Sequence, residues 1–310
     1  MRGCLRFLII TGWLLGLACG AAHATSVVIV SSERSPAYAE AAEALIVGLE
    51  RNGLSRYDML QQTLPEFERS RLASPKLFVA LGTEAALALA KAELQVPVLS
   101  ALLPRSSFER VLAETKRRPS AQFSVIYLDQ PLSRQLDLIH LALPAAKHLG
   151  VLWGPDSKPQ ASALKTLAQA RGLDVADASV TGSEHLFVSL KRVLETADVL
   201  LGVPDPLVFN SNSIQNILLS SFRAAVPMVG FSPAYVRAGA LFALYATPAQ
   251  IGQQAATLAS RVVQNKGPLP EPVYSQDFTV AVNEHVARAL GLRLDAAVLT
   301  TRLRSLEATK

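Results

Sequence analysis

SVVIVSSERSPAYAEAAEALIVGLERNG, residues 26–53, contains one complete strand–helix unit. Residues 26–30 form a continuous apolar run, which is typical of a strand buried on both faces of a parallel sheet. A helix is predicted over residues 37–51, and Asn52-Gly53 ends it. A strand followed by an amphipathic helix is therefore the unit to follow along the rest of the chain.

The same alternation continues in two series. In the first series, further strands are predicted at residues 57–62, 77–81, 96–101 and 120–127, and Gly82-Thr83-Glu84 begins a helix. In the second series, strands are predicted at residues 148–153, 174–178, 198–203, 227–230, 240–246 and 277–282, with helices at 132–143, 160–171, 184–195, 214–225, 248–264 and 283–290. This pattern predicts an α/β fold class with two Rossmann-like lobes, each a parallel sheet flanked by helices.

Two short junctions marked by proline separate the series. They are Asp129-Gln130-Pro131 and Ala246-Thr247-Pro248. We expect lobe 1 to comprise residues 25–128 plus 247–276, and lobe 2 to comprise 129–246 plus 277–310. A chain that passes between two lobes more than once can let them close on each other about a hinge.

Residues 1–24 are typical of a secretory signal peptide. Arg2 and Arg6 give a charged start, residues 7–17 are apolar, and Ala22-His23-Ala24 has the small-x-small pattern that signal peptidase recognises. The apolar core is shorter than the ~20 residues of a membrane-spanning helix. We therefore expect cleavage after Ala24 and release into the periplasm.

Cys19 offers an alternative start. In Leu17-Ala18-Cys19-Gly20 it could carry the lipid of a membrane-tethered lipoprotein, but Gly16 stands where such sites usually have leucine. Both cysteines of the chain, Cys4 and Cys19, lie in the leader. From Thr25 onward the sequence therefore excludes zinc–thiolate sites and cysteine nucleophiles.

Charge and motifs exclude further classes of function. After the leader, 28 Lys and Arg stand against 25 Asp and Glu, a formal charge of +3, and Lys116-Arg117-Arg118 is the longest basic run. That charge is too small and scattered for nucleic-acid binding, and the run is typical of a solvated helix end. The chain has no HExxH, GxSxG, Walker or GxGxxG motif. We expect no catalytic residues, no metal, no cofactor and no enzymatic activity.

Solutes bind open parallel sheets beyond the carboxyl ends of the strands, so the loops after the predicted strands contain the candidate residues. Hydroxyl and backbone N–H groups there suit a carboxylate, and an acidic side chain suits an ammonium or hydroxyl group. Aromatic rings at the same level could clasp a planar ligand or a cation. The candidates are Ser31, Ser32, Tyr38, Gly82, Thr83, Tyr127, Trp153, Asp205, Phe231 and Tyr235.

Each candidate also has a structural explanation. Thr83 could cap its own helix, and Asp205, between two prolines, could be a turn residue. Each aromatic ring could be ordinary core packing. Trp153, the one tryptophan outside the leader, is expected at the mouth of the cleft.

Four stretches of the chain resemble one known family in their order and spacing. They are residues 135–153, residues 197–205, residues 225–252 and residues 278–292. In them the chain is similar to the periplasmic substrate-binding proteins of ABC importers (ABC_sub_bind), the family that includes the tryptophan/tyrosine-type binding proteins. The resemblance implies a type I periplasmic binding fold, two Rossmann-like lobes with a ligand cleft between them. It also implies that Ser32, Gly82, Thr83 and the Asp205 loop line that cleft.

Three cleft loops differ from the common pattern of that family. They are Ser124-Val-Ile-Tyr-Leu128, Asp156-Ser157-Lys158-Pro159, and Asp205 followed by Pro206 where asparagine is commoner. The resemblance therefore predicts the fold of this chain better than it predicts the ligand.

The leading hypothesis is a monomeric periplasmic protein that captures a small organic solute, an amino acid or related carboxylate, for an inner-membrane ABC permease. A ligand-sensing or accessory module for a receptor kinase or an outer-membrane uptake system is the alternative. A periplasmic enzyme is the third hypothesis.

Overall fold

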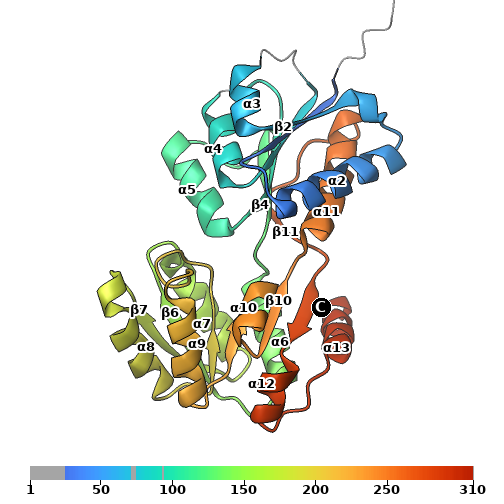
Figure 1. Ribbon diagram of the computed structural model, residues 1–310. Helices are drawn as coiled ribbons and strands as arrows, with labels where there is room; N and C mark the ends of the chain where they lie inside the picture. The colour runs from blue at the N-terminus through green and yellow to red at the C-terminus, as the bar shows by residue number, and fades with distance from the viewer. Residues whose placement is uncertain (1–24, 71–74, 93, 310) are drawn as a thin grey trace, which may run out of the picture.

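The computed structural model describes residues 25–70, 75–92 and 94–309, and the predicted leader lies outside them. These residues form two lobes joined at a narrow waist (Figure 1). Within the described chain each lobe has a six-stranded sheet, in the order β11-β5-β4-β3-β1-β2 in lobe 1 and β12-β10-β9-β8-β6-β7 in lobe 2. This is the predicted α/β class, in a type I periplasmic-binding-protein-like architecture.

Lobe 1 is built on the first strand–helix unit. Its strands are β1 (Val27–Ser31), β2 (Met59–Thr63), β3 (Leu77–Leu81), β4 (Val98–Leu103), β5 (Phe123–Tyr127) and β11 (Val273–Tyr274), all paired in parallel. Its helices are α2 (Pro36–Arg51), α3 (Leu64–Arg69), α4 (Thr83–Lys91), α5 (Arg105–Thr115) and α11 (Pro248–Val263).

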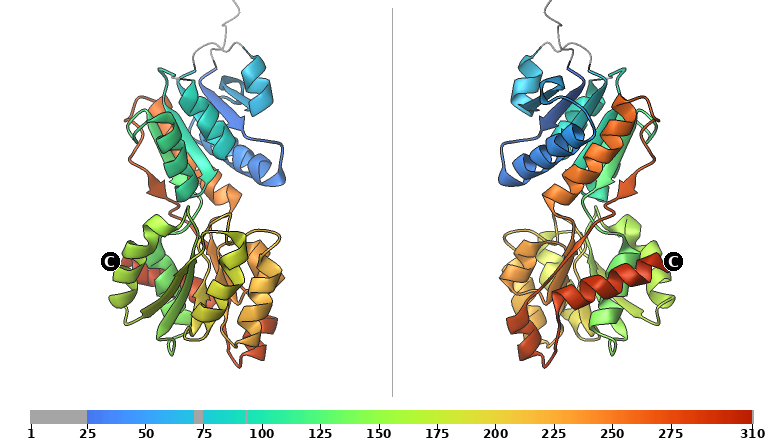
Figure 2. Two further views of the ribbon diagram at one scale, coloured as in Figure 1. Left: turned by 90° about the vertical axis from the view of Figure 1, so that its left-hand side faces the viewer. Right: turned by 90° about the vertical axis from the view of Figure 1, so that its right-hand side faces the viewer.

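The alternation of side chains along β1 explains why every residue of that strand is buried. Val27 and Ile29 pack against α2 and α11 on one face of the sheet, and Val28 and Val30 pack against α4 and α5 on the other. Figure 2 shows α2 and α11 side by side, although about 200 residues separate them in sequence. Contacts with α2 and with strands β3 and β4 attach α11 to lobe 1.

Lobe 2 repeats this plan. Its strands are β6 (His148–Trp153), β7 (Asp174–Ser179), β8 (Val199–Leu201), β9 (Met228–Gly230), β10 (Phe242–Tyr245) and β12 (Thr279–Val282). Its helices are α6 (Leu132–Ala142), α7 (Ala161–Gln169), α8 (Leu186–Leu194), α9 (Ile214–Arg223), α10 (Pro233–Ala238), α12 (Glu284–Ala289) and α13 (Ala296–Ala308). Strand β12 pairs antiparallel with β10, so the expectation of an entirely parallel sheet is wrong at this edge.

The chain crosses the waist after β5, after β10 and after β11. Arg134 of α6 connects the first and third crossings: its guanidinium donates to Gln130 Oε1 at 2.6 Å and to the Ser275 carbonyl at 2.9 Å. It also pairs with Glu307 of α13 and lies 4.8 Å from the centre of the Phe278 ring. These contacts hold the crossings together at one edge of lobe 2.

Candidate ligand-binding site

A cavity of about 440 Å³ lies between the lobes at the waist. Its walls come from the loops that follow β1, β4 and β5 in lobe 1 and β8, β9 and β10 in lobe 2. Carboxyl ends of parallel strands from both sheets therefore meet at one place, as the open-sheet rule requires. The lining residues are Glu33, Ser35, Ala37, Tyr38, Leu102, Pro104, Leu128, Asp129, Pro204, Phe231, Ser232, Pro233, Tyr245, Ala246 and Pro248.

Phe231 is the main aromatic contribution from lobe 2. Its ring centre lies 4.5 Å from that of Tyr235 and 5.9 Å from that of Phe209, which meets it edge-on. Of these three rings, Phe231 lines the cavity, and the other two hold it in place. Burial raises the pKa of Tyr235 to about 12, which keeps its hydroxyl neutral.

Tyr38 is the corresponding ring of lobe 1. Gly82, with φ of +94°, lies so close to it that a Cβ atom at that position would be 2.4 Å from the tyrosine oxygen. Glycine is thus required there by both the backbone conformation and the space. Burial raises the pKa of Tyr38, although a hydrogen bond with Ser32 acts in the opposite direction. Gly82 contributes to the cleft indirectly, through the position of this ring.

Ser32 caps helix α4 from a neighbouring loop. Its hydroxyl accepts the Ala85 N–H at 3.0 Å and donates to the Leu81 carbonyl at 3.1 Å. Thr83 makes no side-chain cap; it is the first residue of α4, and Gly82 is the N-cap. The explanation that Thr83 caps its own helix is therefore wrong. Ser32, Gly82 and Thr83 are absent from the cavity wall, which differs from what the resemblance implied.

A second, more polar recess of about 670 Å³ adjoins the cavity on lobe 1. It shares Glu33, Ser35 and Tyr38 with the cavity, and the buried Ser31 is part of its wall. Arg34, also in this wall, pairs with Glu66 at 2.6 Å. The recess therefore contains a basic group, but that group already has an acidic partner.

Asp205 is turned into lobe 2. Its carboxylate accepts the Ser157 N–H and the Ser157 hydroxyl, each at 2.9 Å, and the Leu207 N–H at 3.0 Å. A Cβ atom at Gly154 would lie 2.1 Å from Asp205 Oδ1, so the loop after β6 wraps closely around the carboxylate. Asp205 is 3 % exposed and absent from the cavity wall. The structure supports its interpretation as a turn residue, and the predicted contact of Asp205 with the cleft is wrong.

Trp153 and Tyr127 belong to the cores of their lobes. Trp153 is fully buried, and its indole N–H donates to Asp177 Oδ2 at 2.9 Å, so its predicted place at the cleft mouth is wrong. Tyr127 lies between Phe108 and Tyr274, and burial raises its pKa to about 12. Both are last residues of strands buried on both faces, which point their side chains at helices rather than along the strand into the cleft.

Asp129 is the principal residue that sequence reasoning missed. It follows β5 at the first crossing, and its Oδ1 accepts the Arg105 N–H at 2.8 Å at the start of α5. Burial raises the pKa of Asp129 to about 6. The sequence marked this junction as a crossing, and the same signal applied to its acidic residue would have identified Asp129. Of the ten candidates, the cavity wall contains Tyr38 and Phe231.

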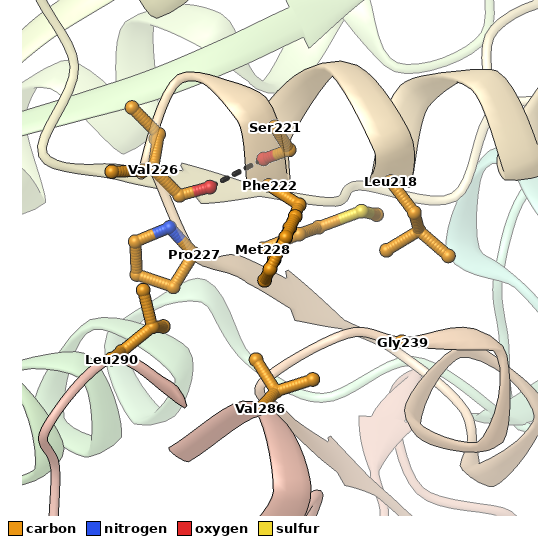
Figure 3. A pocket seen from close by; sticks show the side chains of 10 residues that line it. Leu218, Ser221, Phe222, Val226, Pro227, Met228, Gly239, Val286 and Leu290 are labelled. Atoms are coloured by element: carbon orange, nitrogen blue, oxygen red, sulfur yellow. Dashed lines mark hydrogen bonds between the residues drawn. The ribbon is translucent and has the colours of Figure 1, made fainter. Parts of the chain in front are cut away.

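A separate hollow lies at the opposite end of β9 from the cleft. Figure 3 shows Leu218, Phe222, Met228 and Val286 converging on it. Its volume is about 10 Å³, room for about one water molecule. Size therefore excludes it as a solute site.

Metal-binding clusters and membrane-spanning helices are both absent from the described part of the chain. Residues 25–70, 75–92 and 94–309 contain no group of three or more His, Cys, Asp or Glu able to hold a metal ion. In the same ranges, no helix combines the length and apolar character needed to cross a membrane.

The sequence matches the family model described as ABC transporter substrate binding protein over residues 69–304. The chain belongs to this family. Members of this family bind a solute and are not enzymes, and they act with an ABC transporter. Among curated proteins, none matches this chain significantly in sequence.

Solved structures share the fold of this substrate-binding protein. A ligand-free, open substrate binding protein with adhesive properties from Clostridium difficile has a TM-score of 0.70 and 20% identity, over 88% of this chain and 96% of that one. An ABC domain from Streptococcus pneumonia in complex with L-Trp has a TM-score of 0.63 and 17% identity, over 89% of this chain and 97% of that one. A conserved domain protein from Vibrio cholerae has a TM-score of 0.62 and 21% identity, also over 89% of this chain and 97% of that one.

Proposed function

We propose that this substrate-binding protein captures one small organic solute in the cavity between its lobes and delivers it to an inner-membrane ABC permease. The observation that carries this proposal is the cavity itself, which is lined by both lobes and by the first two crossings. Its volume of about 440 Å³ lies in the usual range for small-molecule sites.

Closure of the lobes follows from that position. A solute that touches Tyr38 of lobe 1 and Phe231 of lobe 2 binds more tightly when the lobes approach each other. Such a solute shifts the population toward the closed form, because its contacts differ between the two forms. The closed form then presents a surface made of both lobes to the permease.

The class of solute proposed first is an amino acid. The Streptococcus structure contains L-Trp, and the cavity of this chain combines aromatic rings with acidic and hydroxyl groups. Aromatic walls suit a planar side chain, and an acidic group suits the amine of an amino acid. The alternative solute in this proposal is a carboxylate related to an amino acid.

The periplasm is the proposed location, with the leader cleaved after Ala24 and the protein released as a monomer. Tethering through Cys19 is the alternative. Mass spectrometry of protein purified from the periplasm tests both, since a mature chain that begins at Thr25 has lost Cys19.

Thermal-shift screening against amino acids, amines, sugars and carboxylates, followed by calorimetry and small-angle scattering, tests the function. We expect at least one solute to raise the melting temperature and reduce the radius of gyration. Phe231→Ala should weaken binding, and Phe187→Ala, which removes a 43 % exposed ring of α8 outside the cavity, should leave it unchanged. A complete absence of binders and of compaction would contradict the proposal.

A further inference from the structure

The charged groups that line the cavity are all acidic. Glu33 and Asp129 are in its wall, and the described wall contains no Lys, Arg or His. Glu33 is exposed and makes no hydrogen bond or ion pair with any other described residue. Asp129 has one oxygen fixed by the Arg105 N–H. The charged side chains of the wall itself are therefore both acidic, and the nearby Arg105 offsets part of the charge of Asp129.

Nearby basic side chains have other partners. Arg105 follows the wall residue Pro104, but its Nε donates to Glu109 at 2.7 Å and its terminal nitrogen lies 3.4 Å from the Tyr274 hydroxyl. Arg34 in the adjoining recess is held by Glu66. Each guanidinium therefore already has an acidic partner, Glu109 for Arg105 and Glu66 for Arg34, which offsets its positive charge.

Four prolines reduce the number of backbone donors in the wall. Pro104, Pro204, Pro233 and Pro248 are all in the wall, and proline has no N–H to offer to an anion. On the lobe 2 side, the wall also contains Phe231, Ser232, Tyr245 and Ala246. A carboxylate placed here would lose water and meet no cationic side chain of the wall, which is costly unless hydrogen bonds replace that water.

The aromatic residues favour the opposite charge. Phe231 presents a ring held by two other rings, Tyr38 adds a ring from lobe 1, and Tyr245 adds one from the end of β10. The faces of aromatic rings attract ammonium groups, and this attraction strengthens as water is excluded. An amine bound by Glu33 of lobe 1 and the Phe231 ring of lobe 2 would touch both lobes and so favour closure.

We propose that the solute of this cleft is an organic cation, an amine on an apolar or aromatic body without a carboxylate, with Glu33 and Asp129 as its acidic partners and Phe231 as its aromatic partner. This inference rests on the proposed function, since it concerns the charge of the solute in that same cleft. It replaces the amino acid or carboxylate proposed first, because such a solute has a carboxylate for which the wall provides no cationic side chain.

Matched sets of probes test the charge directly. Tryptamine, L-tryptophan and indole-3-acetate share one ring system and differ in charge, and phenethylamine, L-phenylalanine and phenylacetate form a second set. Calorimetry should give an affinity for the amine about tenfold or more above that of the amino acid, and weaker binding still for the acid. The same protein is screened in parallel with a library sorted into cations, zwitterions, neutral solutes and anions.

Variants test whether the two carboxylates cause the preference. Glu33→Gln and Asp129→Asn should each lower the affinity for the best cation about five- to tenfold, with little effect on neutral solutes. Glu68→Gln is the matched control, since Glu68 is an exposed carboxylate of α3 outside the cavity wall. Glu33 is exposed, so its variant keeps the test informative even if Asp129→Asn changes the fold.

The outcomes separate the two proposals. If the best solute is neutral, zwitterionic or anionic, the inference of a cation is overturned and the solute-binding function stands. Cation binding that survives both substitutions unchanged also overturns the inference. If no class of solute binds or compacts the protein, both proposals fail.

Discussion

Asp205 and Asp129 both follow strands of parallel sheets at the cleft end of their lobes, yet they have opposite environments. Asp205 is enclosed by its own lobe and accepts three hydrogen bonds from Ser157 and Leu207. Asp129 accepts the backbone N–H groups of Arg105 and of Asp129 itself, has no hydroxyl partner among the described residues, and borders the cavity. One carboxylate stabilises a loop, and the other remains available to a solute.

A position beyond the carboxyl end of a strand is therefore necessary for a binding role but not sufficient. What decides is whether the surrounding loop supplies enough N–H and O–H donors to satisfy the carboxylate. The loop at Gly154 to Ser157 closes around Asp205, whereas Asp129 has only backbone donors, the N–H groups of Arg105 and of Asp129 itself. Substitutions at the satisfied carboxylate and at the carboxylate that borders the cavity should therefore have different effects.

The largest effect is expected from Asp205→Ala. The substitution removes the acceptor of three hydrogen bonds and leaves buried N–H groups of Ser157 and Leu207 without partners. We expect the free energy of unfolding to fall by about 3 kcal/mol. Urea unfolding measures this, and Ser157→Ala, which removes one of the donors, should cost about 1 kcal/mol. Unchanged stability with loss of solute binding would reverse the roles assigned to the two aspartates.

The second largest effect on the free energy of unfolding is expected from Asp129→Asn, and this effect depends on pH. The pKa of Asp129 in the folded protein is about 6, above the unfolded value, so the protonated form favours folding. Wild-type stability is therefore lost as the pH rises through 6, whereas the neutral asparagine escapes that loss. The variant should be more stable than wild type by on the order of 1 kcal/mol at pH 7.5 and nearly equal at pH 4.

Unfolding curves at the two pH values measure that difference. Arg105, Glu109, Tyr127 and Tyr274 also face Asp129, so the comparison uses the difference between the two proteins rather than either curve alone. A difference that does not change with pH would contradict the raised pKa.

A smaller effect is expected at the contact between the lobes. Asp156, in the loop that encloses Asp205, pairs with Arg110 of α5 at 3.3 Å across the cleft. Both side chains are partly exposed, so Arg110→Ala should change the free energy of unfolding by about 0.2–1 kcal/mol. The change should shrink in high salt, and scattering should show whether the lobes open further. Equal effects in low and high salt would show that this ion pair is not the cause.

The smallest effect is expected from Trp153. Since its indole is fully buried in lobe 2 and bonded to Asp177, its fluorescence should not change when a solute binds. Phe231→Trp places a second tryptophan in the cavity wall, and its emission should respond to the same solute. A solute-dependent change in wild-type emission would mean that binding reaches the core of lobe 2.

Much of the fold could be predicted because its strands are buried on both faces. Strands β3 and β6 have the predicted bounds, since a short apolar run between polar loops indicates such a strand directly. Helices α3, α5, α10 and α13 were missed. In α13 the buried residues are Leu299 and Leu303, so most of that helix has no apolar pattern to detect.

The direction of β12 could not be predicted. A strand has the same apolar pattern whichever way it runs, and contact with β10 determines its orientation. The same limit applies to the site: the sequence indicated the loops of the cleft but not which side chain of each loop faces it.

By itself, the sequence determined the two α/β series, their crossings and the level of the cavity between the lobes, because burial on both faces of a sheet leaves a local pattern of apolar residues. The tertiary structure decided that Asp205 and Trp153 turn inward while Asp129, Glu33 and Phe231 face the cavity. That choice depends on donors and rings supplied by segments distant in sequence, and no local pattern contains that information.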